Sequence, residues 1–422
     1  MIPKILLQKA DELERKTALK YPELAPLAKQ CFLNTIETTV TQLKDGSYFV
    51  ITGDIPAMWL RDSAAQLRPY IKYAKEDPDL QKILRSVLEK YEFYVNLDPY
   101  TNAFNSEPKA GYSENDLSNF QSGWIWERKY EVDSLCAPLY FAHQYFEATG
   151  DRSIFTEEFR LMVQTIAQTF FTEQHHDRSS YWFVRENCPK SDTLPFGKGR
   201  PVNLTGMTWS GFRPSDDACK FGYLIPSNMM AVVAMHKAVE LLKAGGYEDH
   251  ALLGRCFNLA EEIQDGIETY GIYDHPKYGK IYAYETDGFG NYNLMDDANS
   301  PSLLSIPYLG YKSAEDPIYQ NTRRFILSKD NPYYYEGNAA KGVGSPHTPN
   351  GYIWHIGLVM QILTSTDEEE KQACLSTLAR THAGTNYMHE GFDANDPTQF
   401  TRPWFAWANT LFAQMLAEEV SL

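Results

Sequence analysis

The feature of this 422-residue sequence that most restricts its fold is an alternation of two kinds of helical segment. Segments 132–146, 352–363 and 404–416 are apolar on nearly every side, which is typical of a helix buried all round. Segments with one apolar stripe, typical of a helix that faces water on one side, are 4–19, 78–95, 155–175, 248–268 and 366–382. The alternation predicts about a dozen helices in two concentric rings, an α/α barrel. A less regular all-α domain is the alternative.

The sequence also predicts where some helices begin and end. Ser227 is expected to cap a helix that the Gly245–Gly246 pair ends, because serine accepts from free N–H groups and glycine adopts left-handed backbone. The apolar stripe of this helix is Ala231, Ala234, Ala238 and Leu241. Pro403 is expected in the first turn of the last helix, where a missing N–H is tolerated.

Two stretches interrupt the helical pattern. Segment 179–213 contains the strand-like residues 181–184 and then a Gly/Pro-rich passage, and segment 271–298 is expected to be a hairpin that turns at Asp287–Gly288. Loops of this length in a compact domain tend to be functional. Since no linker or repeat divides the chain, we expect one domain over residues 1–422, with a few short strands in its loop insertions.

Charge and composition narrow the class of partner. The formal net charge of −16 disfavours nucleic acid and anionic membranes, which need a basic surface. No apolar run reaches the roughly 18 residues that a membrane span requires, and the short apolar run at the start does not resemble a signal peptide. The six scattered cysteines predict free thiols in a reducing compartment. We therefore expect a cytoplasmic protein, and no patch in the sequence indicates a protein partner.

Polar and aromatic residues gather just before, or at the start of, the predicted inner helices. These segments are 54–63, 124–133, 209–217, 296–301, 347–355, 389–393 and 402–404. In an α/α barrel the inner helices all begin at the same end. We therefore expect the segments to surround one mouth of the barrel.

Taken singly, these residues have structural interpretations. Arg61–Asp62 and Arg213–Asp216 are candidate ion pairs, and the aromatic residues Trp404 and Trp407 are candidate core. The residue types that cap helices are represented by Asp54, Asp62, Ser300 and Asn350. Only the recurrence of such residues at one predicted end favours a functional site.

A site rich in tryptophan, carboxylate, arginine and histidine suits carbohydrate chemistry. Aromatic faces pack on sugar rings, polar side chains bond the hydroxyls, and hydrolysis of a glycoside needs two carboxyl groups. The sequence has no HExxH or Cys-rich zinc motif, no phosphate-binding loop and no nucleophile elbow. We therefore predict neither a catalytic metal nor a cofactor.

Four of the segments, 53–63, 210–217, 347–349 and 389–392, resemble glycoside hydrolase family 125, the exo-α-1,6-mannosidases. The resemblance spans nearly the whole chain. It implies an (α/α)6 barrel that hydrolyses non-reducing terminal mannose with inversion and without a metal. By motif it implies that Asp217 is the general acid and Glu390 the general base, with Asp216 as the reserve candidate for the acid.

The resemblance also implies which residues bind a mannose-containing oligosaccharide. Trp59, Trp126 and Trp354 are the expected ring platforms. The expected polar ligands are Arg61, Asp62, Asp133, Arg213, Asp216, Asp297, Asn299, His347 and Arg402. Exo action needs a closed pocket, and segment 179–213 is expected to close it.

Three other functions were compared with this one. A glycoside phosphorylase on the same barrel would need basic and Ser/Gly donors near Glu390, where the sequence is instead acidic and polar. A non-catalytic carbohydrate-binding protein would use the carboxylates only as hydroxyl ligands. A zinc-dependent prenyltransferase-type barrel lacks its ligand set in this sequence.

Overall fold

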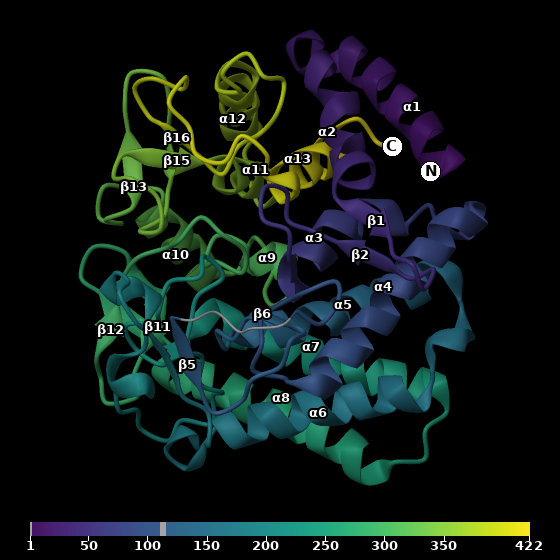
Figure 1. Cartoon of the computed structure of the whole chain (residues 1–422). Coiled ribbons are helices and arrows are strands. Elements are labelled where there is room, and N and C mark those ends of the chain that lie inside the picture. Colours follow the sequence, from purple (N-terminus) through teal and green to yellow (C-terminus); the bar gives the residue numbers. More distant parts are fainter. Residues whose placement is uncertain (1, 110–114) are drawn as a thin grey trace.

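Thirteen α-helices and a set of short strands make up the part of the chain that the computed structural model describes, residues 2–109 and 115–422 (Figure 1). Five long or buried helices lie inside. They are α3 (Leu60–Ile71), α5 (Val132–Thr149), α7 (Ile225–Gly245), α11 (His355–Leu363) and α13 (Ala406–Glu419). Helix α3 packs between α13 and α5, α5 packs on α7, and α11 packs on α13. The short helix α9 (Ile306–Leu309) contacts α7.

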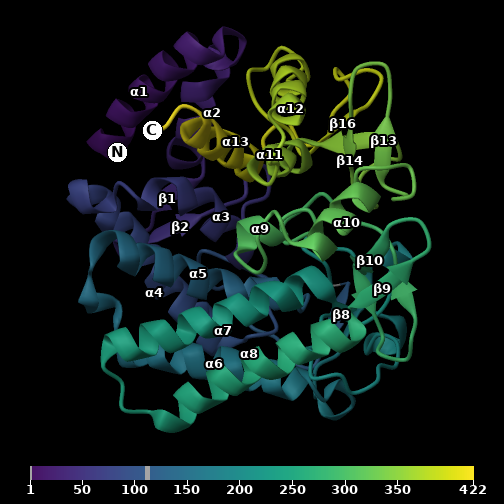
Figure 2. The same cartoon turned by 180° about the vertical axis from the view of Figure 1, so that it is seen from behind.

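The remaining helices cover this inner group. Helices α6 and α8 run along one side of the molecule and α1 along the opposite side (Figures 1 and 2). The outer helices are α1 (Lys4–Lys20), α2 (Ala25–Thr38), α4 (Pro78–Leu97), α6 (Glu157–Glu173), α8 (His250–Tyr270), α10 (Pro317–Ile326) and α12 (Glu368–Arg380). Helix α2 packs on α13, α8 on α7 and α12 on α11. In the described residues, no helix has the length and apolarity that a membrane crossing requires.

Burial follows the predicted alternation. All residues from Ala406 to Ala413 of α13 are buried, whereas α8 buries only a stripe that includes Leu252, Leu259 and Ile263. Every inner helix listed above is therefore packed on both sides. The predicted segments 132–146, 155–175, 248–268 and 366–382 are confirmed as α5, α6, α8 and α12, and 4–19 and 78–95 as α1 and α4.

Inner and outer helices begin differently. Five outer helices start at a side-chain cap: Asp77, Thr156, Asp249, Asp316 and Asp367 accept from backbone N–H groups of α4, α6, α8, α10 and α12. Each of the five inner helices instead follows an extended residue whose side chain makes no capping bond: Trp59, Glu131, Leu224, Trp354 and Phe405. The side chains at the inner starts are therefore free to build a site.

Short strands hold the inner starts in place. Strand β3 (Met58–Trp59) joins β4 (Ala103–Phe104) and β6 (Ile125–Glu127), with Trp59 opposite Ala103. Strand β8 (Tyr223–Leu224) pairs with β11 (Glu285–Thr286), and β15 (Tyr352–Trp354) pairs with β16 (Gly391–Asp393). Because each of β3, β8 and β15 runs directly into an inner helix, the strands fix where these helices begin.

Three expected helix starts are wrong. Helix α7 begins at Ile225, with Pro226 in its first turn, and the Ser227 hydroxyl donates to Asp133 Oδ1 (2.9 Å). Helix α13 begins three residues after Pro403, because Asp54 N–H and Ala406 N–H bond Trp404 O and Thr52 O and keep this stretch extended. The segment 352–363 begins as strand β15 and becomes helical only at His355.

The strand predictions are partly confirmed. The strand-like segment 181–184 corresponds to β7 (Phe183–Arg185), which pairs with β5 (Asp116–Ser118). Segment 271–298 forms two hairpins, β9 (Ile272–His275) with β10 (Gly279–Tyr282), and β11 with β12 (Tyr292–Asn293). Only the second turns at Asp287–Gly288. Two further pairs are β1 (Val40–Gln42) with β2 (Tyr48–Val50), and β13 (Tyr334–Glu336) with β14 (Lys341–Val343). The predicted helix end is confirmed, since Gly246 terminates α7 with φ 75°.

Candidate active site

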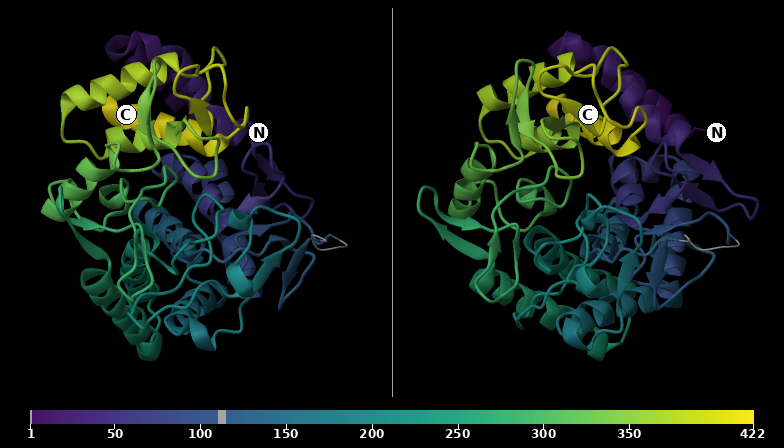
Figure 3. Two further views of the ribbon diagram at one scale, coloured as in Figure 1. Left: turned by 90° about the vertical axis from the view of Figure 1, so that its left-hand side faces the viewer. Right: turned by 60° about the vertical axis from the view of Figure 1, so that its left-hand side comes forward.

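A cavity of about 250 Å³ lies at the starts of the inner helices, and we call it the polar cavity. Figure 3 shows the loops and short strands that surround this end of the helices, viewed from two directions. The residues that line it are Thr52, Ile55, Trp59, Arg61, Asp62, Pro214, Ser215, Asp216, Asn299, His347, Trp354, Glu390, Arg402 and Phe405. They come from segments far apart in the sequence, so the fold gathers most of the predicted mouth into one pocket.

Nine of the predicted site residues line the polar cavity: Trp59, Arg61, Asp62, Asp216, Asn299, His347, Trp354, Glu390 and Arg402. The others support these. Asp133 is buried behind Arg61, Asp297 accepts from Ser215 Oγ (2.6 Å), and Arg213 bonds Glu285 (2.7 Å) rather than Asp216. Trp126 packs with Trp59 in a small apolar cluster and has Lys109 Nζ 5.1 Å from its ring. Trp407 is buried core, as expected, whereas Trp404 is only half-buried and its Nε1 donates to Thr38 Oγ1 (3.1 Å), so the expectation that Trp404 is core is wrong.

Arg61 organises the floor of the polar cavity. It sits in the first turn of α3 and is 4% exposed. Its Nη1 lies 3.3 Å from both Asp62 Oδ2 and Glu131 Oε2, and its Nη2 donates to the Pro214 carbonyl. Its Nε lies 3.3 Å from Asp133 Oδ2, close enough for an ion pair although neither atom makes a regular hydrogen bond. Removing Arg61 would therefore leave buried carboxylates without their cation.

Glu390 faces the polar cavity from the segment that leads into β16. Its Oε1 is 3.7 Å from Arg402 Nη1, and Arg402 is held in turn by Asp54, which accepts from its Nε at 2.9 Å. The peptide before Glu390 is fixed because His389 N–H donates to Nδ1 of His355 (2.9 Å). Burial lowers the pKa of His355 to about 3, so its imidazole is neutral and able to accept. Glu390 thus projects from a rigid support.

The two neighbouring acids Asp216 and Asp217 point to different partners. They lie in a tight turn in which Asp216 has φ 68°, a left-handed conformation that Asp tolerates better than most residues. Asp216 Oδ1 accepts from Trp59 Nε1 and from Asn102 Nδ2, both at 3.4 Å, and Asp216 lines the polar cavity. Asp217 is 7% exposed, and its Oδ1 lies 3.2 Å from His347 Nδ1.

The electrostatics of the site combine burial with cations. Burial opposes ionisation of Asp216, but Lys129, Arg61 and His347 outweigh it and hold the pKa of Asp216 below its usual value. Burial also opposes the charge on His347, yet its hydrogen bond to Asp217 and the charge of Glu390 raise its pKa to about 9. The polar cavity therefore contains an imidazolium at neutral pH.

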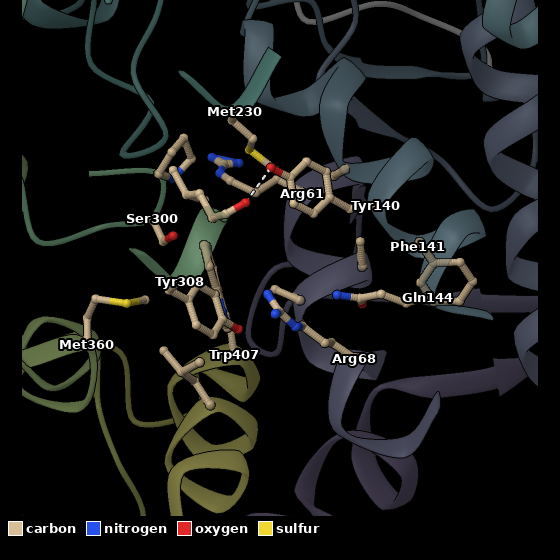
Figure 4. A pocket seen from close by; sticks show the side chains of 16 residues that line it. Arg61, Arg68, Tyr140, Phe141, Gln144, Met230, Ser300, Tyr308, Met360 and Trp407 are labelled. Atoms are coloured by element: carbon tan, nitrogen blue, oxygen red, sulfur yellow. Dashed lines mark hydrogen bonds between the residues drawn. The ribbon is translucent and has the colours of Figure 1, made fainter. Parts of the chain in front are cut away.

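A second cavity, of about 60 Å³, lies behind Arg61, and we call it the rear chamber (Figure 4). Arg61 and Trp407 contribute to its wall, and most of the rest is apolar, including Met230, Met360 and Leu411. The guanidinium of Arg68 stacks on the ring of Tyr308 with its central carbon 4.0 Å from the ring centre. Figure 4 shows the two arginines and Tyr308 around one space.

The prediction missed several residues of the site. Thr52, Ile55, Pro214, Ser215 and Phe405 line the polar cavity, and all of them are within a few residues of a predicted ligand. A second group acts from behind the lining residues: Asn102, Lys129 and Glu131. Segment 124–133 belongs to the predicted mouth, but Trp126 and Asp133 are its only predicted ligands. The signal that Glu131 matters is its place directly before a helix that is apolar all round.

Among residues 2–109 and 115–422, no group of three or more histidine, cysteine, aspartate or glutamate side chains is arranged to hold a metal ion. The six cysteines are unpaired thiols, and five of them are buried.

The sequence and fold were compared with known proteins. A family described as metal-independent alpha-mannosidase (GH125) matches residues 21–417. The Schizosaccharomyces pombe protein called meiotically up-regulated gene 157 protein is 40% identical over 426 residues, which cover 96% of this chain and 83% of that protein.

Solved structures give the same result. A Streptococcus pneumoniae metal-independent α-mannosidase, in a non-productive complex with α-1,6-mannobiose, is 46% identical and superposes with a TM-score of 0.96 over 100% of both chains. A bacterial glucoamylase bound to acarbose shares the fold alone, with 14% identity and a TM-score of 0.58 over 99% of this chain and 57% of its own. The chain described here belongs to the metal-independent α-mannosidases of glycoside hydrolase family 125.

Proposed function

We propose that this protein is an exo-acting α-1,6-mannosidase that hydrolyses non-reducing terminal mannose with inversion, on an (α/α)6 barrel formed by residues 1–422 as one domain. The observation that carries the proposal is the polar cavity, in which Asp216 and Glu390 face one space between Trp59, Trp354 and Arg402. The similarity to an α-mannosidase crystallised with α-1,6-mannobiose supports the linkage. A cytoplasmic location stays a prediction from the sequence.

Glu390 is the proposed general base. An inverting glycosidase needs an ionised carboxylate that removes a proton from the water that attacks the anomeric carbon. Arg402 Nη1 lies 3.7 Å from Glu390 Oε1, so a positive charge lies beside the proposed base. The neutral His355 holds the preceding peptide, so the carboxylate is aimed before substrate arrives.

Asp216 is the proposed general acid. The resemblance implied Asp217 with Asp216 in reserve, and we now favour Asp216 because it is among the residues that line the cavity, whereas Asp217 is not among them and pairs with the lining residue His347. An acid must reach the glycosidic oxygen, and although Lys129, Arg61 and His347 lower the pKa of Asp216 in the free protein, the proposal requires Asp216 to hold a proton once substrate has displaced water from the cavity. We assign Asp217 the role of fixing His347, whose imidazolium faces the sugar hydroxyls together with Asp62, Asn299 and Arg402.

The reaction then follows from these positions. The proton of Asp216 passes to the glycosidic oxygen, which departs with the electron pair of the broken C–O bond. Glu390 takes a proton from water as the water oxygen bonds the anomeric carbon from the opposite face. The surrounding carboxylates stabilise the positive charge that develops on the sugar ring.

Asp216→Asn and Asp217→Asn distinguish the two candidate acids. Asparagine tolerates left-handed backbone, so Asp216→Asn is expected to fold. We expect it to slow hydrolysis of α-1,6-mannobiose by about 10³-fold, but hydrolysis of 2,4-dinitrophenyl α-mannoside by less than about tenfold, since that leaving group needs no proton. Asp217→Asn is expected to slow both substrates by the same factor. The opposite pattern would assign the acid to Asp217.

A further inference from the structure

Asp216 is the last residue of a short hairpin loop, and this loop holds it in an unfavourable backbone conformation. Arg213 N–H donates to the Asp217 carbonyl (2.8 Å) and Asp216 N–H to the Arg213 carbonyl (2.9 Å), which is the bonding pattern of a type I turn followed by one left-handed residue. That residue is usually glycine, whereas here it is Asp216, with φ 68°. A side chain in this conformation persists only where its surroundings hold it.

The ammonium of Lys129 holds the loop at Asp216. Lys129 is 2% exposed, and its Nζ donates to the Asp216 carbonyl (2.9 Å). Other donors hold an earlier part of the loop, because Arg61 Nη2 and Asn299 Nδ2 both donate to the Pro214 carbonyl. Lys129 is therefore the side chain that orients the peptide after Asp216, and this peptide joins the two neighbouring acids.

Two carboxylates keep Lys129 in place, and neither depends on it alone. Lys129 Nζ bonds Asp192 Oδ1 and lies 3.5 Å from Glu127 Oε2. Arg185 bonds the same two carboxylates, at 2.9 Å from Asp192 Oδ2 and 2.8 Å from Glu127 Oε2. Because Arg185 stays with both carboxylates, removal of the Lys129 ammonium leaves neither of them without a cation. The main consequence of its removal is then the lost bond to the Asp216 carbonyl.

We propose that Lys129 is a positioning residue for the general acid: its ammonium fixes the peptide between Asp216 and Asp217, so that Asp216 faces the polar cavity and Asp217 faces His347. The inference rests on the proposed function, in which Asp216 is the acid. Lys129 is not among the residues that line the polar cavity, so it reaches the acid through the backbone rather than through the sugar.

The charge of Lys129 predicts the opposite effect on the acid. Lys129 is one of the cations that lower the pKa of Asp216. If charge were its whole contribution, its removal would favour the protonated form of Asp216, and protonation of the leaving group would not be slowed. A loss confined to the step that needs the acid therefore indicates lost position.

The leaving group of the substrate separates positioning of the acid from a merely structural role. Lys129→Met keeps an apolar stem and removes the donor. We expect kcat on α-1,6-mannobiose to fall by about 10- to 100-fold, as slight misplacement of a reacting group does, and KM to change by less than about threefold. Hydrolysis of 2,4-dinitrophenyl α-mannoside, whose leaving group needs no proton, should slow by less than about threefold. Equal losses on the two substrates, or no loss on either, would overturn the inference.

Lys129→Gln keeps the test decisive if Lys129→Met does not fold. Glutamine still bonds Asp192, but it is one bond shorter than lysine and does not reach the Asp216 carbonyl, so we expect the same selective loss. Lys198→Met is the matched control, because Lys198 is a half-buried lysine whose Nζ donates to another backbone carbonyl, that of Ser179. It should lower thermal stability and leave the ratio of the two rates unchanged. A selective loss in this control as well would overturn the inference.

A crystal structure of folded Lys129→Met gives a readout that does not depend on kinetics. We expect the Asp216 carbonyl to turn away and its carboxyl group to leave Trp59 and Asn102, and an unchanged Asp216 would overturn the inference. If Asp217→Asn rather than Asp216→Asn shows the dependence on the leaving group, the proposed acid fails. A selective loss in Lys129→Met would then still show that Lys129 positions the peptide between the two acids.

Discussion

The polar cavity and the rear chamber share Arg61 but differ in the rest of their walls. The polar cavity is lined by residues that lie before the inner helices or in their first turns, and it contains three carboxyl groups. The rear chamber is lined mainly by the following turns of the same helices, with Ala64, Ala137, Met360 and Leu411. The difference shows that one inner helix contributes polar cavity-lining side chains at its start and apolar packing side chains in its middle.

The difference between the polar cavity and the rear chamber depends on how the inner helices begin. Five of the outer helices use Asp or Thr side chains to cap their own N–H groups. Inner helices follow an extended residue instead. The carboxyl groups of Asp62, Glu131 and Asp216 therefore do not cap helices and remain available to the site. The following predictions test whether substitutions in the polar cavity reduce enzyme activity and substitutions in the rear chamber reduce the stability of the fold.

The largest effect is expected from Glu390→Gln. Glutamine keeps the shape of the side chain but cannot accept the proton of water, so kcat on α-1,6-mannobiose should fall by about 10³-fold or more. The melting temperature should change little, because Glu390 is a cavity-lining residue with an arginine 3.7 Å away. Steady-state kinetics with purified variant checks this prediction. Activity within tenfold of the wild type would remove Glu390 as the base.

A matched pair on α3 sharpens the comparison. Arg61→Met removes the cation from three buried carboxyl groups and should lower the free energy of unfolding by about 3–5 kcal/mol. Arg68→Met, two turns later on α3, should lower it by less than about 1 kcal/mol, because no carboxylate in residues 2–109 and 115–422 lies within ion-pair distance of Arg68. Urea unfolding measures both variants, and equal losses would contradict the distinction between the two arginines.

Leu411→Ala tests the rear chamber itself. Leu411 is 2% exposed and lines the chamber, so its truncation should enlarge an apolar cavity and lower the free energy of unfolding by about 3 kcal/mol. We expect kcat on α-1,6-mannobiose to stay within about twofold of the wild type, measured well below the new melting temperature. A large loss of kcat in the folded variant would show that the chamber takes part in catalysis.

Two histidines should give smaller, opposite pH effects on stability. The pKa of His355 is lowered to about 3, so the unfolded chain alone takes up this proton below about pH 6.5 and stability falls with acidification between these values. The pKa of His347 is raised to about 9, so its contribution is present below about pH 6.5 and is lost as the pH rises towards 9.

Unfolding curves from pH 4 to pH 9 measure these contributions. His355→Asn should flatten the acidic side of the stability profile, and His347→Asn should flatten the alkaline side. If a variant leaves the acidic or alkaline side of the profile as steep as in the wild type, the replaced histidine does not have the shifted pKa given above.

Much of the fold could be predicted from the sequence because burial leaves a periodic signal. Helices α5 and α13 are apolar all round, and α8 shows a single stripe. The starts of the inner helices could not be predicted in the same way. Pro403 and Ser227 carry local signals for a helix start, but backbone pairing of Trp404 with Asp54 and the bond from Ser227 to Asp133 decide the outcome.

The site could be predicted as a set of segments but not as a set of roles. The segments around Arg61, His347 and Glu390 do meet, since each lies before an inner helix or at its start. Whether a residue faces the cavity depends on backbone angles, and neighbours such as Asp216 and Asp217 differ only through a turn with φ 68°. Lys129 was missed because its role depends on two distant residues, Asp192 and Asp216.

The most direct test of the proposed function is a proton NMR time course of α-1,6-mannobiose hydrolysis, with a chelator present and phosphate absent. Our account predicts that β-mannose appears first, because Glu390 directs water to the face opposite the departing oxygen. Early α-mannose would contradict inversion. Failure to turn over until phosphate is added would contradict hydrolysis itself.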